Sequence, residues 1–255
     1  MGRTITFFYG IVAYVIFLAS FLYAIGFVGN FLVPKGIDDG VQGPIVASMI
    51  INLLLLSVFA IQHSVMARPG FKRIWTRLIP KSAERSTYVL RSSFALVLIY
   101  ALWRPITGVI WDQSGTTLGV VLLAVHWAGW LIVLTSTFMI DHFDLFGLKQ
   151  VYSNLTRTEF RPLGFSKVLF YRLVRHPIMS GFLIAFWAAP TMTVGHLLFA
   201  AVTTAYIFVA VKHFEERDLV AEIGDDYLAY QEEVGAFIPG IDKARRQPTA
   251  TGLSE

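Results

Sequence analysis

Long apolar runs separated by short polar segments occupy most of this chain. A helix needs about 20 consecutive apolar residues to cross a bilayer. Runs of this length cover roughly residues 5–29, 45–66, 88–110 and 117–140. A further run from Ile178 to Val211 is interrupted by Pro190 and Gly195, which favours two short helices folded back on each other. The pattern predicts an all-α integral membrane protein with four full transmembrane helices plus a short transmembrane helical hairpin.

Two segments outside these runs have the pattern of interfacial helices. In residues 67–87, apolar side chains recur at helical spacing and basic ones fall on the other side. The apolar set is Phe71, Ile74, Trp75, Leu78 and Ile79, and the basic set is Lys72, Arg73 and Arg77. In residues 213–239, Gly224 can end one short helix and Asp225 can cap the next. We expect these two helices to close over the mouth of the hairpin.

The sequence shows no internal repeats and no low-complexity linkers that would separate domains. We predict a single membrane domain over residues 1–241. The remaining residues, 242–255, are mostly small or polar and are expected to form a flexible tail.

Composition agrees with a membrane location. The chain has 255 residues, of which 55% are hydrophobic and 15% charged, and its mean hydropathy is +0.61. These values exclude an ordinary soluble domain.

The formal net charge of +4 comes from basic residues whose distribution among the loops indicates the membrane topology. They concentrate in residues 68–85 and 149–175, whereas the loops at 30–44 and 104–117 carry only Lys35 and Arg104. By the positive-inside rule the two basic segments are cytoplasmic, and with Arg3 both termini are cytoplasmic too. Since no single basic patch forms, we expect no nucleic-acid partner.

Cysteine and histidine usage narrows the possible chemistry. The chain has no cysteine, which excludes disulfides, thiolate nucleophiles and cysteine metal sites. Four histidines and three carboxylates would suffice for one or two metal ions, namely His63, His142, His176, His213, Asp141, Asp144 and Glu215. Because no His-x-x-His or Glu-x-x-His pair occurs, we predict no metal site.

Polar residues stand at the start of the predicted hairpin, in the string Arg175-His176-Pro177. Proline is tolerated in the first turn of a helix, and the residue before it avoids helical angles. Arg175 and His176 are therefore expected beside a helix N-terminus, which favours anionic groups. A snorkelling arginine and a capping histidine would give the same string. Gly181 would let either a ligand or a neighbouring helix approach closely.

A second polar group follows the hairpin directly. Glu215 and Glu216 lie where the second short helix is expected to leave the bilayer. Tyr227 and Tyr230 share one face of the next helix, at positions i and i+3. These residues suit either a binding pocket or solvated and interfacial positions.

The N-terminal half supplies further polar residues at the same predicted membrane face. His63 lies near the end of the second span, Tyr88 and Arg91 near the start of the third, and Asp141 and His142 at the end of the fourth. A network of interhelical hydrogen bonds would explain them structurally. Their convergence with Arg175, His176 and Glu215 favours a functional site.

The ordered set Arg-His-Pro-x-x-x-Gly, Glu-Glu, Tyr-x-x-Tyr and Phe-Ile-Pro resembles the C-terminal half of the isoprenylcysteine carboxyl methyltransferase-like superfamily of membrane methyltransferases. The resemblance implies that S-adenosyl-L-methionine binds in about residues 165–241. It implies the cofactor-binding residues Arg175, His176, Pro177, Gly181, Glu215, Glu216, Tyr227 and Tyr230. The superfamily usually has a tyrosine where this chain has Met179, so a role for that hydroxyl is not carried over.

Four strings in the N-terminal half extend the resemblance over nearly the whole chain. They begin at Gln62, Glu84, Trp103 and Asp141, and they resemble bacterial methanethiol S-methyltransferases. The resemblance implies methylation of methanethiol to dimethyl sulfide in the bacterial inner membrane, with a small thiol and the bilayer as partners. Two alternatives stay open: methylation of a prenyl-cysteine carboxylate or a lipid amine, and a non-enzymatic accessory factor related to denitrification.

Thiol methylation requires a base, because a thiol is mostly protonated at neutral pH. Asp141 or His142 can take the proton, directly or relayed through Tyr88 or His63. We therefore predict the catalytic residues Asp141, His142, His63 and Tyr88, and the sequence does not decide between them.

Overall fold

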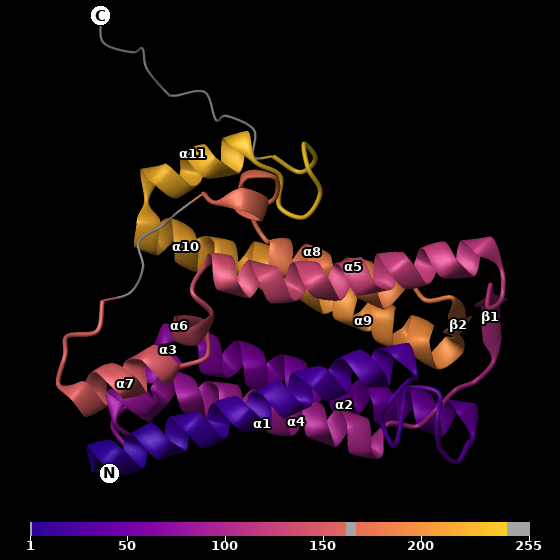
Figure 1. The fold of residues 1–255 in the computed structure, drawn as a ribbon, viewed down its shortest axis with the longest axis horizontal. Helices are drawn as coiled ribbons and strands as arrows, with labels where there is room; N and C mark the ends of the chain where they lie inside the picture. Colours follow the sequence, from indigo (N-terminus) through magenta and orange to yellow (C-terminus); the bar gives the residue numbers. More distant parts are fainter. Residues whose placement is uncertain (1, 162–166, 244–255) are drawn as a thin grey trace, which may run out of the picture.

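The computed structural model describes residues 2–161 and 167–243 (Figure 1). Its helices are α1 (Arg3–Gly29), α2 (Ile45–Ala67), α3 (Pro69–Trp75), α4 (Glu84–Leu102), α5 (Thr117–Met139), α6 (His142–Leu145), α7 (Leu148–Thr156), α8 (Pro177–Trp187), α9 (Val194–Ala210), α10 (Glu216–Ile223) and α11 (Asp225–Glu233). Short 3-10 helices cover Lys81–Ala83 and Leu169–Arg172, and a π-helical turn covers Val211–Glu215. Two strands, β1 (Val109–Asp112) and β2 (Thr191–Thr193), are the exceptions to the predicted all-α fold in the described residues. The predicted tail lies outside these residues from position 244 onward.

Four helical segments of the described chain are long and apolar enough to cross a membrane, by length and composition. They are α1, α2, α5 and the continuous stretch Val194–Ile223. The number of long apolar segments therefore equals the predicted number of full spans, but one of the four segments is not the predicted one. The second helix of the expected short hairpin is one of the long segments, because α9 continues through the π turn into α10.

The predicted third span, 88–110, is wrong at both ends. Its helix, α4, begins at Glu84 and ends at Leu102. Pro105 follows closely, and a residue before proline avoids helical angles. The Lys35 ammonium group donates to the carbonyls of Ala101 and Trp103, 2.8 and 2.9 Å away, which satisfies the end of the helix.

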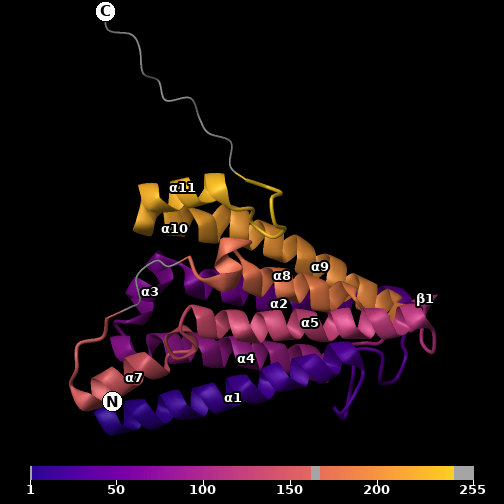
Figure 2. The same cartoon turned by 45° about the horizontal axis from the view of Figure 1, so that its top comes forward.

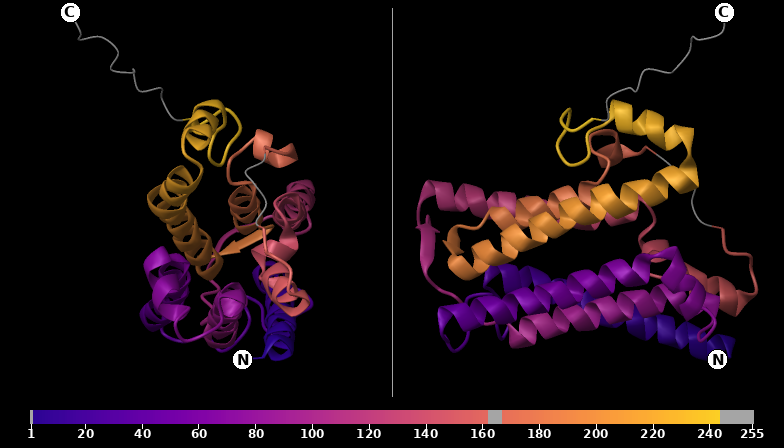
Figure 3. Two further views of the ribbon diagram at one scale, coloured as in Figure 1. Left: turned by 90° about the vertical axis from the view of Figure 1, so that its left-hand side faces the viewer. Right: turned by 180° about the vertical axis from the view of Figure 1, so that it is seen from behind.

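The long helices form two layers (Figures 1 and 2). One layer contains α1, α2 and α4, and the other contains α5, α8 and α9. Helices α5 and α8 pack extensively on each other, and α2 joins the layers through α9. Figure 3 shows α10 and α11 at one end of the bundle and the two strands at the opposite end.

Helix α8 has only eleven residues, so it ends inside the apolar bundle. Two buried histidines satisfy its last carbonyls. His126 Nδ1 lies 2.8 Å from the carbonyl oxygen of Ala185, and His196 Nε2 lies 2.9 Å from that of Phe186. The chain then turns at Pro190 into β2, which pairs antiparallel with β1. These histidines are structural, because unpaired carbonyls are costly in an apolar interior.

The predicted surface helices are present only in part. The segment 67–87 contains the short helix α3, a 3-10 turn and the beginning of α4. Gly224 does separate α10 from α11, with φ of 76° that favours glycine. Asp225 is the first residue of α11 and not its cap. Helix α11 lies beside α10 at the end of the molecule where α8 begins (Figure 1).

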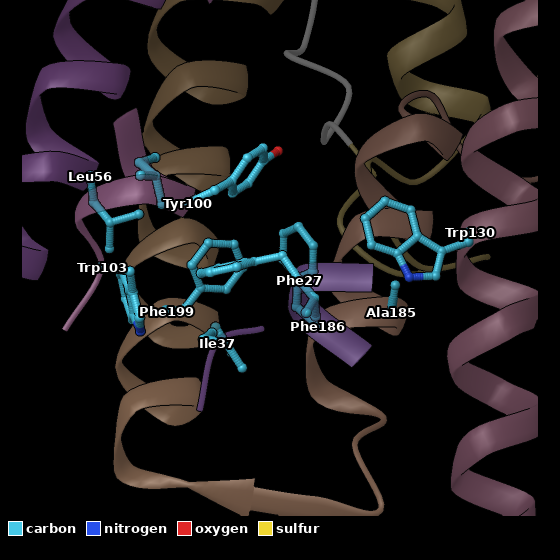
Figure 4. Packing of buried hydrophobic residues seen from close by; sticks show 12 residues of the cluster. Phe27, Ile37, Leu56, Tyr100, Trp103, Trp130, Ala185, Phe186 and Phe199 are labelled. Atoms are coloured by element: carbon cyan, nitrogen blue, oxygen red, sulfur yellow. The ribbon is translucent and has the colours of Figure 1, made fainter. Parts of the chain in front are cut away.

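An aromatic core joins the two layers, away from that end. Phe27, Tyr100, Trp103, Phe186 and Phe199 come from four different helices and one loop, and each is at most 9% exposed (Figure 4). Their rings meet edge to face or at a tilt, for example Trp103 on Phe199 with 5.9 Å between centroids. Such pairs stabilise beyond the area they bury. The core holds together helices whose opposite ends carry the polar residues described next.

Candidate active site at one end of the bundle

The first half of the site is the segment that leads into α8. The Arg175 and His176 amides donate to the carbonyls of Gly235 and Ala236, at 2.8 and 3.0 Å. The Ser180 hydroxyl donates to the carbonyl of Phe237 at 2.7 Å. The Arg-His-Pro and Phe-Ile-Pro strings, about sixty residues apart in sequence, are therefore packed together. Pro177 is the first residue of α8, as predicted.

Arg175 is buried, at 6% exposure, and its guanidinium is fully occupied by the protein. It forms an ion pair of 2.6 Å with Glu216. It also donates to the carbonyls of Gln231, at 3.2 Å, and Val234. Arg175 thus ties the end of α11 to α10 and to the start of α8, which is a positioning role.

His176 lies between two carboxylates. Its Nδ1 is 3.5 Å from Glu215 and its Nε2 is 3.3 Å from Glu216. Burial lowers the pKa of His176, but the hydrogen bonds and charges of both glutamates outweigh it and raise the pKa to about 9. The imidazole is therefore a cation at neutral pH.

The two glutamates differ in what they can still bind. The Glu216 side chain is 13% exposed and is held by Arg175 and His176. The Glu215 side chain is 44% exposed. It ends the π-helical turn, a feature common at functional sites. Glu215 thus offers a partly exposed carboxylate whose partner within the described residues is His176.

Residues from several separate elements surround Glu215. It lies within electrostatic reach of side chains from the second, fourth, ninth and eleventh helices and from the segment before α8. These residues are His63, Tyr88, Tyr171, Tyr206 and Tyr227. Four of the five are tyrosines. A partly exposed carboxylate suits a cationic ligand.

Tyr227 and Tyr230 of α11 are buried, at 2% and 1% exposure. Their rings meet edge to face with 5.8 Å between centroids. The Tyr230 hydroxyl donates to the carbonyl of Tyr171. Burial raises the pKa of Tyr230 to about 12 and also raises the pKa of Tyr227. Both phenols therefore stay protonated and serve as walls or hydrogen-bond donors.

Gly181 lies against a neighbouring helix. The sequence left open whether a ligand or a helix would approach it closely. A side chain added there would lie 2.7 Å from the carbonyl oxygen of Gly129 and 2.9 Å from the amide of Val133, both in α5. Helices α5 and α8 therefore approach closely through this pair of glycines. The contact gives Gly181 no direct place at Glu215.

His63 and Tyr88 form a hydrogen-bonded pair between α2 and α4. The phenol oxygen is 2.8 Å from His63 Nε2, and Ser92 Oγ is 3.1 Å from Nδ1. No other bond of the Ser92 hydroxyl occurs in the described chain, so it can donate or accept. Either tautomer of His63 is thus compatible with its partners.

Asp141 and His142 lie at the same end but belong to a local network with α1 and α5. The His142 ring stacks on Phe138, with 4.2 Å between centroids. Its Nε2 is 2.8 Å from the Tyr14 hydroxyl, and its Nδ1 is 2.8 Å from Thr137 Oγ1. The Thr137 hydroxyl donates to the carbonyl of Leu134. Hence Nδ1 carries the proton and Nε2 accepts from Tyr14.

The charges around this network agree with a neutral His142. Burial lowers the pKa of His142, and the charge of Asp141 opposes that effect. Asp141 itself caps α6 by accepting from the Asp144 amide at 3.2 Å, and it forms an ion pair with Lys149. Its φ of 89° is in the left-handed region. Both residues are thus engaged in holding the α5–α6 turn.

Sequence reasoning missed several residues of the site. Tyr171 and Tyr206 were not singled out, although both lie near Glu215. Ser64 bonds the Tyr206 hydroxyl at 3.1 Å. A single phenol within the apolar run 194–211 was the available signal for Tyr206, since a polar group in lipid needs a partner. Tyr171 gave no such signal.

Known proteins that are similar to this chain identify its family. The fold defines a multi-pass helical membrane protein with a polar site at one end of its bundle. A methanethiol S-methyltransferase from Mycobacterium tuberculosis is 54% identical over 239 residues, which are 94% of this chain and 98% of that protein. Methanethiol S-methyltransferase 2 from Bradyrhizobium diazoefficiens is 53% identical, over 93% of this chain and 91% of that protein. The chain belongs to the methanethiol S-methyltransferase family, which confirms the resemblance.

A more distant relative extends this relationship. Nurim from Rattus norvegicus is 31% identical over 184 residues, or 69% of each chain. No protein-family model matches the chain. No solved structure matches it.

Proposed function

We propose that this protein transfers a methyl group from S-adenosyl-L-methionine to a small volatile thiol, converting methanethiol to dimethyl sulfide. The observation that carries the proposal is the 54% identity to a methanethiol S-methyltransferase over 98% of that protein's length. The arrangement around Glu215 supports it, because a partly exposed carboxylate suits a cationic methyl donor.

The residues at this end fit S-adenosyl-L-methionine in charge. When bound, that molecule supplies a methyl group activated by a sulfonium. Glu215 would meet a positive charge of the donor, and Tyr227 would line the pocket. Glu216, His176 and Arg175 would hold Glu215 in place, since they are bonded to one another. Pro177 would fix the chain at the start of α8.

The reaction also needs a proton acceptor. A bond forms between the thiol sulfur and the methyl carbon, the carbon–sulfonium bond breaks, and the thiol proton passes to a base. We assign the base to the His63–Tyr88 pair, because it lies within reach of Glu215 and His63 can adopt either tautomer. Asp141 and His142 would instead support the site from the α5–α6 turn. Apolar surroundings would keep water from the thiolate.

The test is transfer by the purified protein in nanodiscs. Labelled S-adenosyl-L-methionine is offered with methanethiol, longer thiols, a prenyl-cysteine carboxylate and a lipid amine, and dimethyl sulfide is measured in the headspace. We expect transfer to methanethiol above all. Transfer only to the prenyl-cysteine or the amine would replace the acceptor, and no transfer to any acceptor would favour the accessory role.

The orientation in the bacterial inner membrane is part of the same proposal. The end that carries α3, α10 and α11 holds the basic segments, which favours a cytoplasmic location of that end and of both termini. Reporter fusions after Arg77 should give a cytoplasmic signal and fusions near Asp39 a periplasmic one. The reverse result would separate the site from cytosolic S-adenosyl-L-methionine.

A further inference from the structure

A groove of about 500 Å³ opens on the outer side of α2, where α3 crosses it and α4 runs alongside. Its walls are mostly apolar and include Val58, Ile61 and Val65 of α2 and Phe71 of α3. The three α2 residues are exposed, at 52%, 63% and 47%. Helix α2 is one of the four candidate spans. The groove therefore faces lipid and not the interior of the bundle.

Polar groups stand in this apolar groove without partners. Arg91 of α4 lines it and is exposed, and within the described residues it makes no hydrogen bond or ion pair. Gln62 Oε1 and Trp75 Nε1 belong to lining residues too, and both atoms are buried without a hydrogen bond in the described part of the chain. A charged group beside lipid is costly unless something pairs with it.

We propose that this groove binds one anionic glycerophospholipid of the surrounding leaflet. The lipid phosphate pairs with the Arg91 guanidinium, and an acyl chain lies along Val58, Ile61 and Val65. Both the Trp75 N–H and the Gln62 amide oxygen are buried and unbonded within the described residues. When the lipid binds, these side chains turn toward the groove, where the indole donates to a phosphate oxygen and the amide accepts from a headgroup hydroxyl. Basic grooves between helices at a membrane surface are suited to such headgroups.

Arg91 is placed where its side chain can contact a lipid phosphate, not only the acyl chains. Arg91 is seven residues after the start of α4 at Glu84, which is about 10 Å along the helix axis. Its long side chain can reach from there toward the headgroup region. Helix α3 adds Lys72 and Arg73 at the same end. The groove thus combines an apolar wall for a chain with positive charge for the phosphate.

The groove is separate from the site around Glu215. Gln62 and His63 are neighbours in sequence, and adjacent residues point about 100° apart around a helix. His63 contacts Tyr88 and Ser92 of α4. Arg91, which the sequence pattern grouped with the functional site, instead lines the groove with Gln62. The bound lipid would therefore lie on one side of the α2–α4 contact and the His63–Tyr88 pair on another. Its binding is independent of the proposed reaction.

Native mass spectrometry of the full chain, extracted into mild detergent, tests the proposal. The protein is titrated with phosphatidylglycerol and, separately, with phosphatidylcholine. We expect one phosphatidylglycerol to be retained by the wild type, with at least about tenfold weaker binding in Arg91→Gln, the scale of a lost charged contact. Arg77→Gln is the matched control, because Arg77 is also an exposed arginine but does not line the groove.

Each alternative occupant has its own outcome. Equal retention of phosphatidylglycerol by wild type, Arg91→Gln and Arg77→Gln overturns the proposal. It is also overturned if the wild type retains phosphatidylcholine as well as it retains phosphatidylglycerol. Displacement of the lipid by inorganic phosphate would mean a free anion site and also overturns it. Trp75→Phe keeps the apolar wall and should weaken binding by roughly fivefold, as for one hydrogen bond, which gives a second test if Arg91→Gln folds poorly. S-adenosyl-L-methionine binding should be unchanged in all three variants.

Discussion

Two histidine–tyrosine pairs lie at the same end of the molecule, and they differ in what their histidines can do. In each, the phenol oxygen is 2.8 Å from Nε2. The other nitrogen of His142 faces Thr137, whose proton is already given to Leu134. The other nitrogen of His63 faces Ser92, whose hydroxyl can donate or accept. The first pair is fixed in one tautomer, and the second is compatible with both tautomers of its histidine.

The surroundings separate the two pairs further. His63 and Tyr88 lie within electrostatic reach of Glu215. The charge that acts on His142 is that of Asp141. The same pair of side chains holds a turn in one place and, in the proposed function, takes the thiol proton in the other. The neighbours of the second ring nitrogen distinguish the two. Four predictions test this distinction.

The largest effect is expected at Tyr88 and His63. Tyr88→Phe removes only the hydroxyl, and His63→Gln keeps a polar side chain without an imidazole. Each should lower turnover by on the order of a hundredfold, a typical general-base contribution, with little change in S-adenosyl-L-methionine affinity. Single-turnover kinetics and calorimetry measure the two quantities. Wild-type turnover in both variants would remove the pair from the reaction.

Glu215→Gln should weaken S-adenosyl-L-methionine binding by roughly tenfold or more, because it removes a charge of opposite sign and keeps the size. Calorimetry with purified protein measures the change. Glu222→Gln is the control, since Glu222 is an exposed glutamate of the same helical stretch. Equal affinities in the two variants would show that the charge of Glu215 is not used by the cofactor.

His176 should make stability depend on pH. Its folded-state pKa, about 9, is above the ordinary value of 6.5. The stabilisation is therefore complete below about pH 6.5 and is lost as the pH rises through about 9, roughly 3 kcal/mol in all. Thermal unfolding between pH 6 and pH 10 measures it. His176→Gln should flatten that dependence, and an unchanged profile would contradict the assigned charge.

The smallest effect on catalysis is expected at the fixed pair. Tyr14→Phe leaves His142 Nε2 without its donor and should lower stability by about 1 kcal/mol. Turnover should stay within about threefold of wild type, in contrast to the matched change Tyr88→Phe. A hundredfold loss of turnover in Tyr14→Phe with an intact fold would reverse the roles of the two pairs.

The sequence predicted a mostly helical membrane protein with four long apolar spans, because apolar runs of that length are a local pattern. It did not place the end of α4, where Lys35 from a distant loop satisfies the last carbonyls. It also treated Arg175 and Glu215 as equivalent candidates. Only the folded chain distinguishes an arginine occupied by Glu216 and two carbonyls from the partly exposed carboxylate of Glu215. Local pattern identifies polar residues but not which of their atoms are already bonded.

The π-helical turn Val211–Glu215 makes the direction of its acidic side chain, Glu215, depend on the length of the turn. Each residue added to or removed from an α-helix rotates everything beyond it by about 100°. A π turn, however, takes up one extra residue within a single turn. Deleting Lys212 would therefore leave α10 near its present direction but would change the directions of the side chains within the turn, Glu215 among them. Homologous chains should therefore tolerate substitutions in this turn far better than a change in its length.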